Sequence, residues 1–200
     1  MPGYREDLKA LASQIDELQP TRQAALYAIA GKAVYPASAE ILTRIPGGSV
    51  VGEALEASFL LAFGSTLEGR AQGLLDELQT VVDAAGEVSA PDGLYLQASL
   101  ICADTSLRLT LGDIVGSGDM LEYVLSPLYS SLCERDLGVV DIGSSEPEMA
   151  WEAGLVDDPV MIEAFTYLAT LIQALAVADF DQSAASAWVE RGGILLPLIH

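Results

Sequence analysis

The stretch Pro159-Val-Met-Ile-Glu-Ala-Phe-Thr-Tyr-Leu-Ala-Thr-Leu-Ile-Gln-Ala-Leu-Ala-Val-Ala178 decides the fold, because it is either a membrane span or a helix packed inside a protein. Glu163 interrupts the apolar run, and acidic residues flank it on both sides. Membrane spans usually carry Lys or Arg on one side instead. We therefore interpret this stretch as a helix that other helices cover, and we expect no contact with a membrane.

The rest of the chain repeats this helical character. Apolar residues recur every three or four positions, and almost no segment alternates with a period of two. Pro46-Gly47-Gly48 predicts a boundary with a new helix near Ser49, and Asp157-Asp158-Pro159 predicts another helix start. Tyr35-Pro36 should break or kink the second helix, and Asp119 is a predicted N-cap. The predicted helices cover residues 4–18, 20–45, 49–63, 67–85, 94–111, 120–133, 159–180 and 182–191, with a short turn at 148–154 and an irregular, locally extended segment at 138–147.

Length and composition limit the architecture and the chemistry. Two hundred residues and 51% hydrophobic content indicate one folded domain over 1–200, an all-α helical bundle of about eight helices. A formal charge of -20 argues against binding to nucleic acid or anionic lipid. With one histidine, His200, no zinc site or histidine-based triad can be assembled. The start of the chain lacks a signal peptide, so we expect a cytoplasmic location, and we expect Cys102 and Cys133 to be buried thiols.

Five short segments follow one another in a particular order. They are Ala33-Val34-Tyr35-Pro36, Asp92-Gly93-Leu94-Tyr95 leading into Ala103-Asp104, Ser117-Gly118-Asp119-Met120-Leu121-Glu122, Asp158-Pro159-Val160 and Gly193-Ile194. This order resembles the YjaG-like family of uncharacterised bacterial proteins, and the resemblance spans about Ala24 to Ile194. The chain departs from that family by having less lysine and histidine and an apolar end. The resemblance implies a helical fold and no known activity, so it supplies no catalytic residues.

Acidic residues are concentrated in the second half of the chain. From Thr110 to Val189 there are fourteen acids and one basic residue, Arg135, which leaves thirteen net negative charges. Carboxylates this close together repel one another unless a cation offsets their charge. The densest part lies in or next to predicted loops, where binding residues are common. The predicted partner-binding residues are Asp141, Glu146, Glu148, Trp151, Glu152, Asp157 and Asp158. The alternative interpretation is a solvated acidic surface that favours solubility or suits high salt.

Other chemistries find little support in the sequence. Asp157-Asp158 with Glu163 lacks the spacing of a calcium loop. The segment Gly112–Gly118 lacks the lysine of a phosphate loop, and Cys133 or Ser99 would need a histidine base nearby. We therefore predict no catalytic, cofactor-binding or metal-binding residues, and no cofactor.

The sequence leaves three functions open. The first is a non-enzymatic, cytoplasmic protein-binding module that masks a basic partner, as an immunity protein masks a cationic toxin. The second is a small-molecule-binding or catalytic helical protein with a pocket between helices, lined by Tyr95, Tyr123 or Tyr167. The third is a self-assembling structural protein. The apolar tail 193–200 contains Ile194–Ile199, which should either dock on its own domain or contact a second copy.

Overall fold

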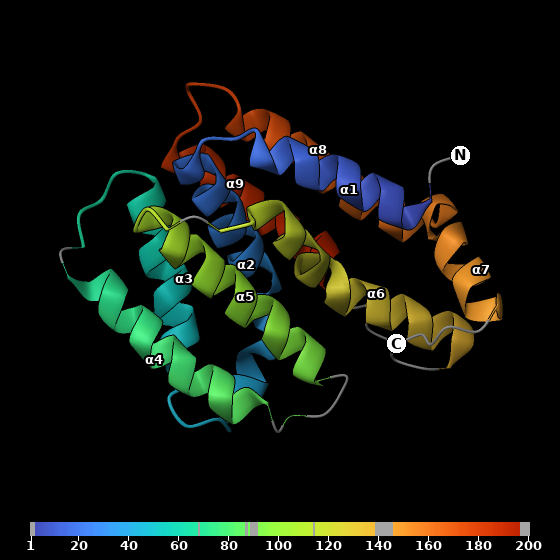
Figure 1. Ribbon diagram of the computed structural model, residues 1–200, viewed down its shortest axis with the longest axis horizontal. Coiled ribbons are helices and arrows are strands. Elements are labelled where there is room, and N and C mark those ends of the chain that lie inside the picture. The colour runs from blue at the N-terminus through green and yellow to red at the C-terminus, as the bar shows by residue number, and fades with distance from the viewer. Residues whose placement is uncertain are drawn as a thin grey trace.

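The computed structural model describes residues 3–67, 69–86, 88, 92–113, 115–138 and 146–196 (Figure 1). Within these residues the chain forms nine α-helices, three short 3₁₀-helices (η) and no strand, so the all-α prediction is confirmed. The ninth helix, α7, is longer than the turn predicted for that region. The elements are α1 (Tyr4–Asp16), α2 (Pro20–Leu42), α3 (Ser49–Ala62), α4 (Arg70–Ala85), α5 (Asp92–Thr110), η1 (Ser117–Met120), α6 (Leu121–Leu137), α7 (Glu146–Gly154), η2 (Leu155–Asp157), α8 (Pro159–Leu175), α9 (Gln182–Arg191) and η3 (Gly192–Leu195).

Helix α2 is the centre of the bundle. It packs against α5, α3 and α9, and every residue from Gln23 to Gly31 is buried. Gly31 allows this crowding, because a Cβ atom there would lie 2.7 Å from the Cβ of Cys102 on α5 and 2.4 Å from Leu55 on α3. Helices α2, α3 and α5 therefore meet where only a glycine leaves enough room.

Pro36 does not interrupt α2, so the predicted break is wrong. Proline removes one backbone donor and clashes with the preceding turn, which costs a helix about 3 kcal/mol. Packing on several sides outweighs that cost, since most helical stability in proteins comes from tertiary contacts. Immediately beyond the proline, Ser38 makes a buried hydroxyl–hydroxyl hydrogen bond of 2.7 Å with Ser99 of α5.

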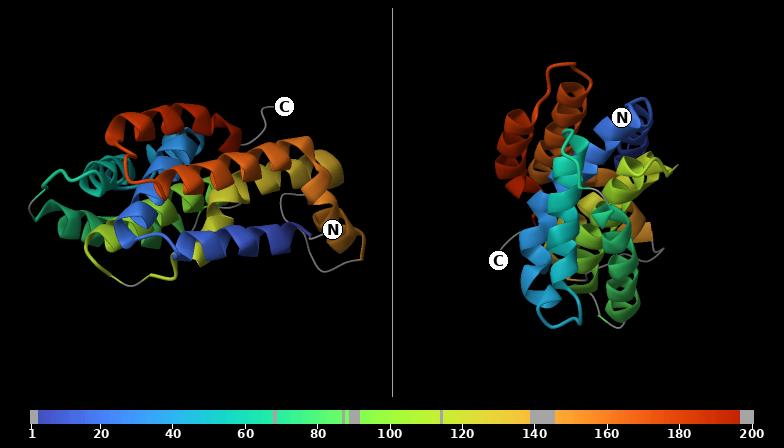
Figure 2. Two further views of the ribbon diagram at one scale, coloured as in Figure 1. Left: turned by 90° about the horizontal axis from the view of Figure 1, so that it is seen from above. Right: turned by 90° about the vertical axis from the view of Figure 1, so that its left-hand side faces the viewer.

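The apolar stretch that begins at Pro159 forms α8. This helix ends at Leu175, five residues before the predicted end at Phe180. One face of α8 is buried in the bundle, whereas Glu163 is exposed on the other. Figure 2 shows α8 lying between α1 and α9. No helix within the described ranges is both long enough and apolar enough to cross a lipid bilayer.

The first part of the apolar tail docks on its own chain. Helix α9 has the bounds predicted from the sequence, and η3 follows it directly. Leu195 is completely buried, and Ile194 packs against the core. This contact accounts for the described part of the tail without a second copy, and residues 197–200 lie outside the described part of the chain.

Three smaller predictions have mixed outcomes. Asp119 lies inside η1, and Met120 occupies the N-cap position of α6, so the predicted cap is wrong. Both cysteines are buried thiols, as predicted, and burial raises the pKa of Cys102 to about 12. The segment predicted to be extended, Val139–Ile142, lies outside the described residues.

Candidate functional site

The predicted site lies where α6 ends, α7 crosses and α8 begins, at one end of the molecule (Figure 1). Gly138 ends α6 in the left-handed conformation, with φ of 72°. Asp158 is the N-cap of α8, because its carboxylate accepts hydrogen bonds from the backbone N–H groups of Val160 at 2.8 Å and Met161 at 3.4 Å. The helix start predicted from Asp158-Pro159 is confirmed.

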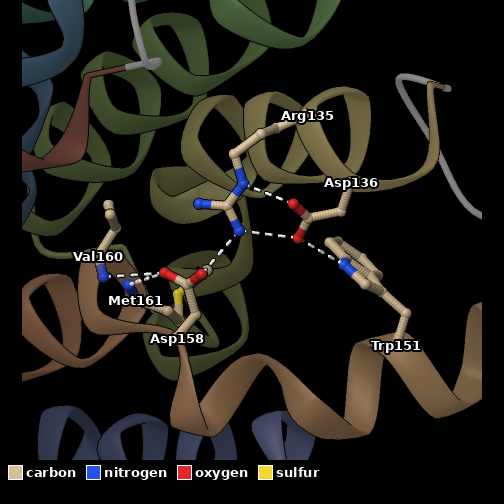
Figure 3. Close-up of polar contacts among 6 residues, drawn as sticks. All are labelled: Arg135, Asp136, Trp151, Asp158, Val160 and Met161. Carbon is tan, nitrogen blue, oxygen red and sulfur yellow. Dashed lines mark hydrogen bonds and ion pairs between the residues drawn. The ribbon is translucent and has the colours of Figure 1, made fainter.

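Arg135 connects the end of α6 to the start of α8. Its guanidinium donates two hydrogen bonds to the carboxylate of Asp136, at 2.5 and 2.8 Å, and one to Asp158, at 2.7 Å. The indole N–H of Trp151 on α7 donates to Asp136 at 2.9 Å. Figure 3 shows the guanidinium held between the two carboxylates, with the indole of Trp151 beyond Asp136. One polar network thus joins α6, α7 and α8.

The network keeps both carboxylates ionised. Hydrogen bonds from Arg135 lower the pKa of Asp136 to about 2, against the opposing effect of partial burial and with help from the indole N–H. Burial alone would raise the pKa of Asp158, but the bonds from Arg135 and from two backbone amides outweigh it and lower that pKa. The helix dipoles favour the positive charge of Arg135 in the last turn of α6 and the negative charge of Asp158 at the start of α8. Asp136 is also in the last turn of α6, so the bonds from Arg135 keep it ionised against the dipole.

A second contact attaches α1 to α7. Arg5 pairs with Glu152 through two nitrogens, at 2.9 and 3.1 Å, and the hydroxyl of Tyr129 donates to the same carboxylate at 3.4 Å. The ring of Tyr129 meets that of Trp151 edge to face, with centroids 5.6 Å apart. The side chain of Glu152 is only 13% exposed. The carboxylate of Glu152 therefore links α7 to α1 within the same chain.

Trp151 and three aspartates surround a groove of about 360 Å³. Asp136, Asp157 and Asp158 supply its charge, and Asp157 is exposed. The residues that complete the wall are Ala150, Gly154, Leu155 and Pro159. None of these described wall residues is basic. The groove combines an aromatic ring with a local excess of negative charge, which is a surface suited to cationic side chains.

The seven predicted partner-binding residues divide into three groups. Trp151, Asp157 and Asp158 come together at the groove, whereas Glu152 is turned toward Arg5. The backbone of Glu146 and Glu148 belongs to α7, but their side chains, like all of Asp141, lie outside the described part of the structure.

Sequence reasoning missed two residues at this site. Asp136 directly follows Arg135, the one basic residue between Thr110 and Val189. This neighbouring position was the sequence signal that could have identified Asp136. Arg5 had no signal, because it is 147 positions away from Glu152. Arg5 and Arg135 neutralise part of the negative charge that was predicted to bind a partner.

The acids of the second half are not all at the groove. Asp179 and Asp181 lie in the turn between α8 and α9, at the other end of α8 from Asp157 (Figure 1). The negative charge is thus spread along the molecule. Among the residues that the structure describes, no three His, Cys, Asp or Glu side chains are grouped closely enough to hold a metal ion.

No family model, no curated protein and no solved structure matches this chain. The resemblance to the YjaG-like family therefore stays a prediction.

Proposed function

We propose that the protein is a non-enzymatic binding module that holds a basic protein partner at the groove around Trp151, in the manner of an immunity protein. The observation that carries this proposal is the lining of the groove by three carboxylates and an indole. Three carboxylates against the nearby Arg135 leave two net negative charges at this place. The buried thiols of Cys102 and Cys133 agree with a reducing, cytoplasmic setting.

Arg135 supports the choice of partner chemistry. Its guanidinium is already bound by Asp136 and Asp158, with paired bonds to one carboxylate. Charge-assisted bonds of this kind are stronger than neutral ones and favour arginine. Asp157 is exposed, so an arginine of the partner can approach it beside the indole of Trp151.

The two kinds of lining group have different tasks. The net charge of -20 accelerates encounter with a cationic partner and makes association sensitive to salt. Trp151 supplies lasting affinity, since aromatic residues at the centre of an interface commonly contribute most of the binding energy. Glu152 and Asp158 support the site indirectly, because their intramolecular ion pairs keep α7 and the start of α8 in position.

The proposal is tested first with an oligoarginine peptide, titrated by calorimetry at low and at physiological ionic strength. Asp157→Asn should weaken binding severalfold, mainly through slower association. Glu77→Gln is the matched control, because it removes one exposed negative charge from α4, at the other end of the molecule (Figure 1). Equal weakening by both variants would show general charge attraction and would overturn the groove as the site.

The second test uses a protein partner. Wild-type protein, Trp151→Ala and the control Glu77→Gln serve as baits in parallel pull-downs from a bacterial lysate across a salt series. A basic protein bound through the groove should be retained by the wild type and by Glu77→Gln, and lost from Trp151→Ala, since removing a central tryptophan typically costs about 2 kcal/mol or more of binding energy. Identical retention by all baits would contradict the proposal.

A further inference from the structure

A cavity separate from the groove at Trp151 lies between the end of α4 and the beginning of α5. Its volume is about 470 Å³, within the range of about 300–1,000 Å³ that is typical of small-molecule sites. Gln97 is the one polar side chain among the described residues that line it, and none of them is charged. The lining residues are Val82, Ala85, Gly86, Val88, Gly93, Leu94, Leu96, Gln97, Leu100 and Ile101.

Small residues create this cavity. Ala85 and Gly86 end α4 where larger side chains would fill the space next to α5. Gly93 allows the first turn of α5 to lie close to Val88, since a Cβ atom there would be 2.7 Å from the carbonyl oxygen of Val88. Leu96 and Leu100 are buried and form an apolar floor, while Val82 is 42% exposed near the opening.

We propose that this cavity binds a small, uncharged, largely apolar molecule, independently of the partner-binding groove. The lining excludes a fixed charge on the ligand, because a buried charge needs a partner and the walls offer none among the described residues. The overall charge of -20 adds a bias against anions such as fatty acids. Gln97 can give or accept one hydrogen bond that orients the ligand.

The volume of the cavity is that of a small-molecule site. Residues 93–101 of α5 form one wall, and Val82, Ala85, Gly86 and Val88, at the end of α4 and just beyond it, form the other. Burial of apolar ligand surface against these walls is the main source of affinity.

The test compares two fluorescent probes with the same ring system. Phenylnaphthylamine is uncharged, and anilinonaphthalene sulfonate adds a sulfonate. We expect saturable binding of the uncharged probe, at least about tenfold tighter than that of the sulfonate. Ala85→Phe should fill the cavity and weaken binding of the uncharged probe at least about tenfold. Gln72→Phe, on the exposed surface of the same helix, should leave binding unchanged.

Gly86→Leu is a second filling variant, in case Ala85→Phe fails to fold. Gly86 is exposed, has an ordinary helical φ of -60° and has no tight contact around the position of its Cβ. It should also weaken binding of the uncharged probe, although less than Ala85→Phe does. Absence of saturable binding to the wild type, or equal binding to Gln72→Phe and to both filling variants, would overturn the cavity as a ligand site.

Discussion

The helices α2 to α5 and the end of the molecule around α7 differ in their buried contacts, although exposed ion pairs also join α2 to α3 and α3 to α4, through Lys32–Glu56 and Arg70–Glu53. In the first region, backbones approach closely at Gly31, and the buried polar side chains include Ser38 and Ser99, which are hydrogen-bonded to each other. In the second, ion pairs of Arg5 and Arg135 join helices at a partly exposed surface. Packing responds little to salt or pH, whereas exposed ion pairs respond to both. The two regions should therefore react differently to the same kinds of perturbation.

The largest expected effect comes from Gly31→Ala in the packed region. Its added methyl group meets Leu55 and Cys102, and overpacking of this kind typically costs about 1–3 kcal/mol. We expect a decrease of about 2 kcal/mol in the free energy of unfolding, measured by urea denaturation.

Gly73→Ala is the matched control for Gly31→Ala. Gly73 is exposed on α4 and nothing lies within 4 Å of the position of its Cβ. Alanine is the better helix former, so this variant should be more stable by about 0.5–1 kcal/mol. A similar gain from Gly31→Ala would mean that α2, α3 and α5 are not packed as closely as described.

Asp158→Ala should have the largest effect in the charged region. It removes the N-cap of α8 together with the bond to Arg135, and loss of such a cap costs about 0.5–2 kcal/mol. We expect a decrease of about 1.5 kcal/mol in the free energy of unfolding.

Asp158→Asn separates the two roles of this residue. Asparagine is a good N-cap but carries no charge, so the variant should lose only the ion-pair contribution, less than about 1 kcal/mol. Equal losses from the alanine and asparagine variants would show that the charge, not the cap, matters at the start of α8.

The sequence predicted this helix start and most others because their causes are local. Asp158-Pro159 combines a capping carboxylate with a proline in the first turn, and Pro46-Gly47-Gly48 cannot continue a helix. Pro36 misled the prediction for a complementary reason. Its cost to the helix is local, but the packing that outweighs this cost comes from α3 and α5, which local patterns do not reveal.

The candidate site was only partly predictable. Charge density along the chain identified Trp151, Asp157 and Asp158, which the structure brings to one groove. It could not identify the partner of Glu152, because Arg5 reaches it from the first helix. An acidic segment indicates where negative charge lies in the sequence, whereas the pairing of that charge depends on the tertiary fold.

Arg135→Gln tests the sensitivity of the charged region to pH. The pKa of Asp136 is lowered from 3.8 to about 2, so its contribution to stability is complete above the ordinary value and is lost as the pH falls toward 2. At pH 7 we expect Arg135→Gln to lower the free energy of unfolding by about 1 kcal/mol, the upper end for exposed pairs. The difference between wild type and variant should shrink progressively as the pH falls below 4, measured by urea denaturation.

Arg44→Gln provides the control for this experiment. Arg44, just beyond the end of α2, pairs with Glu40 in the last turn of that helix, and exposed i,i+4 pairs of this kind contribute about 0.3–0.5 kcal/mol. High salt should reduce the effects of both substitutions. A difference for Arg135→Gln that stays constant between pH 7 and pH 2 would show that the side chain stabilises the protein by packing and not by charge.

The last comparison deletes one hydroxyl in each region. Ser99→Ala removes a buried hydrogen bond of 2.7 Å and should lower the free energy of unfolding by about 1 kcal/mol. Tyr129→Phe removes a bond of 3.4 Å to a carboxylate that Arg5 already pairs with, so the loss should be only a few tenths of a kcal/mol. In the Ser99→Ala variant the hydroxyl of Ser38 still donates to the backbone carbonyl of Tyr35, at 3.1 Å. The double variant Ser38→Ala with Ser99→Ala loses that bond as well and should therefore be less stable than Ser99→Ala alone. If Tyr129→Phe cost more than Ser99→Ala, aromatic packing and hydrogen bonding around α7 would be as specific as the contacts between α2 and α5, and the contrast between the two regions would not hold.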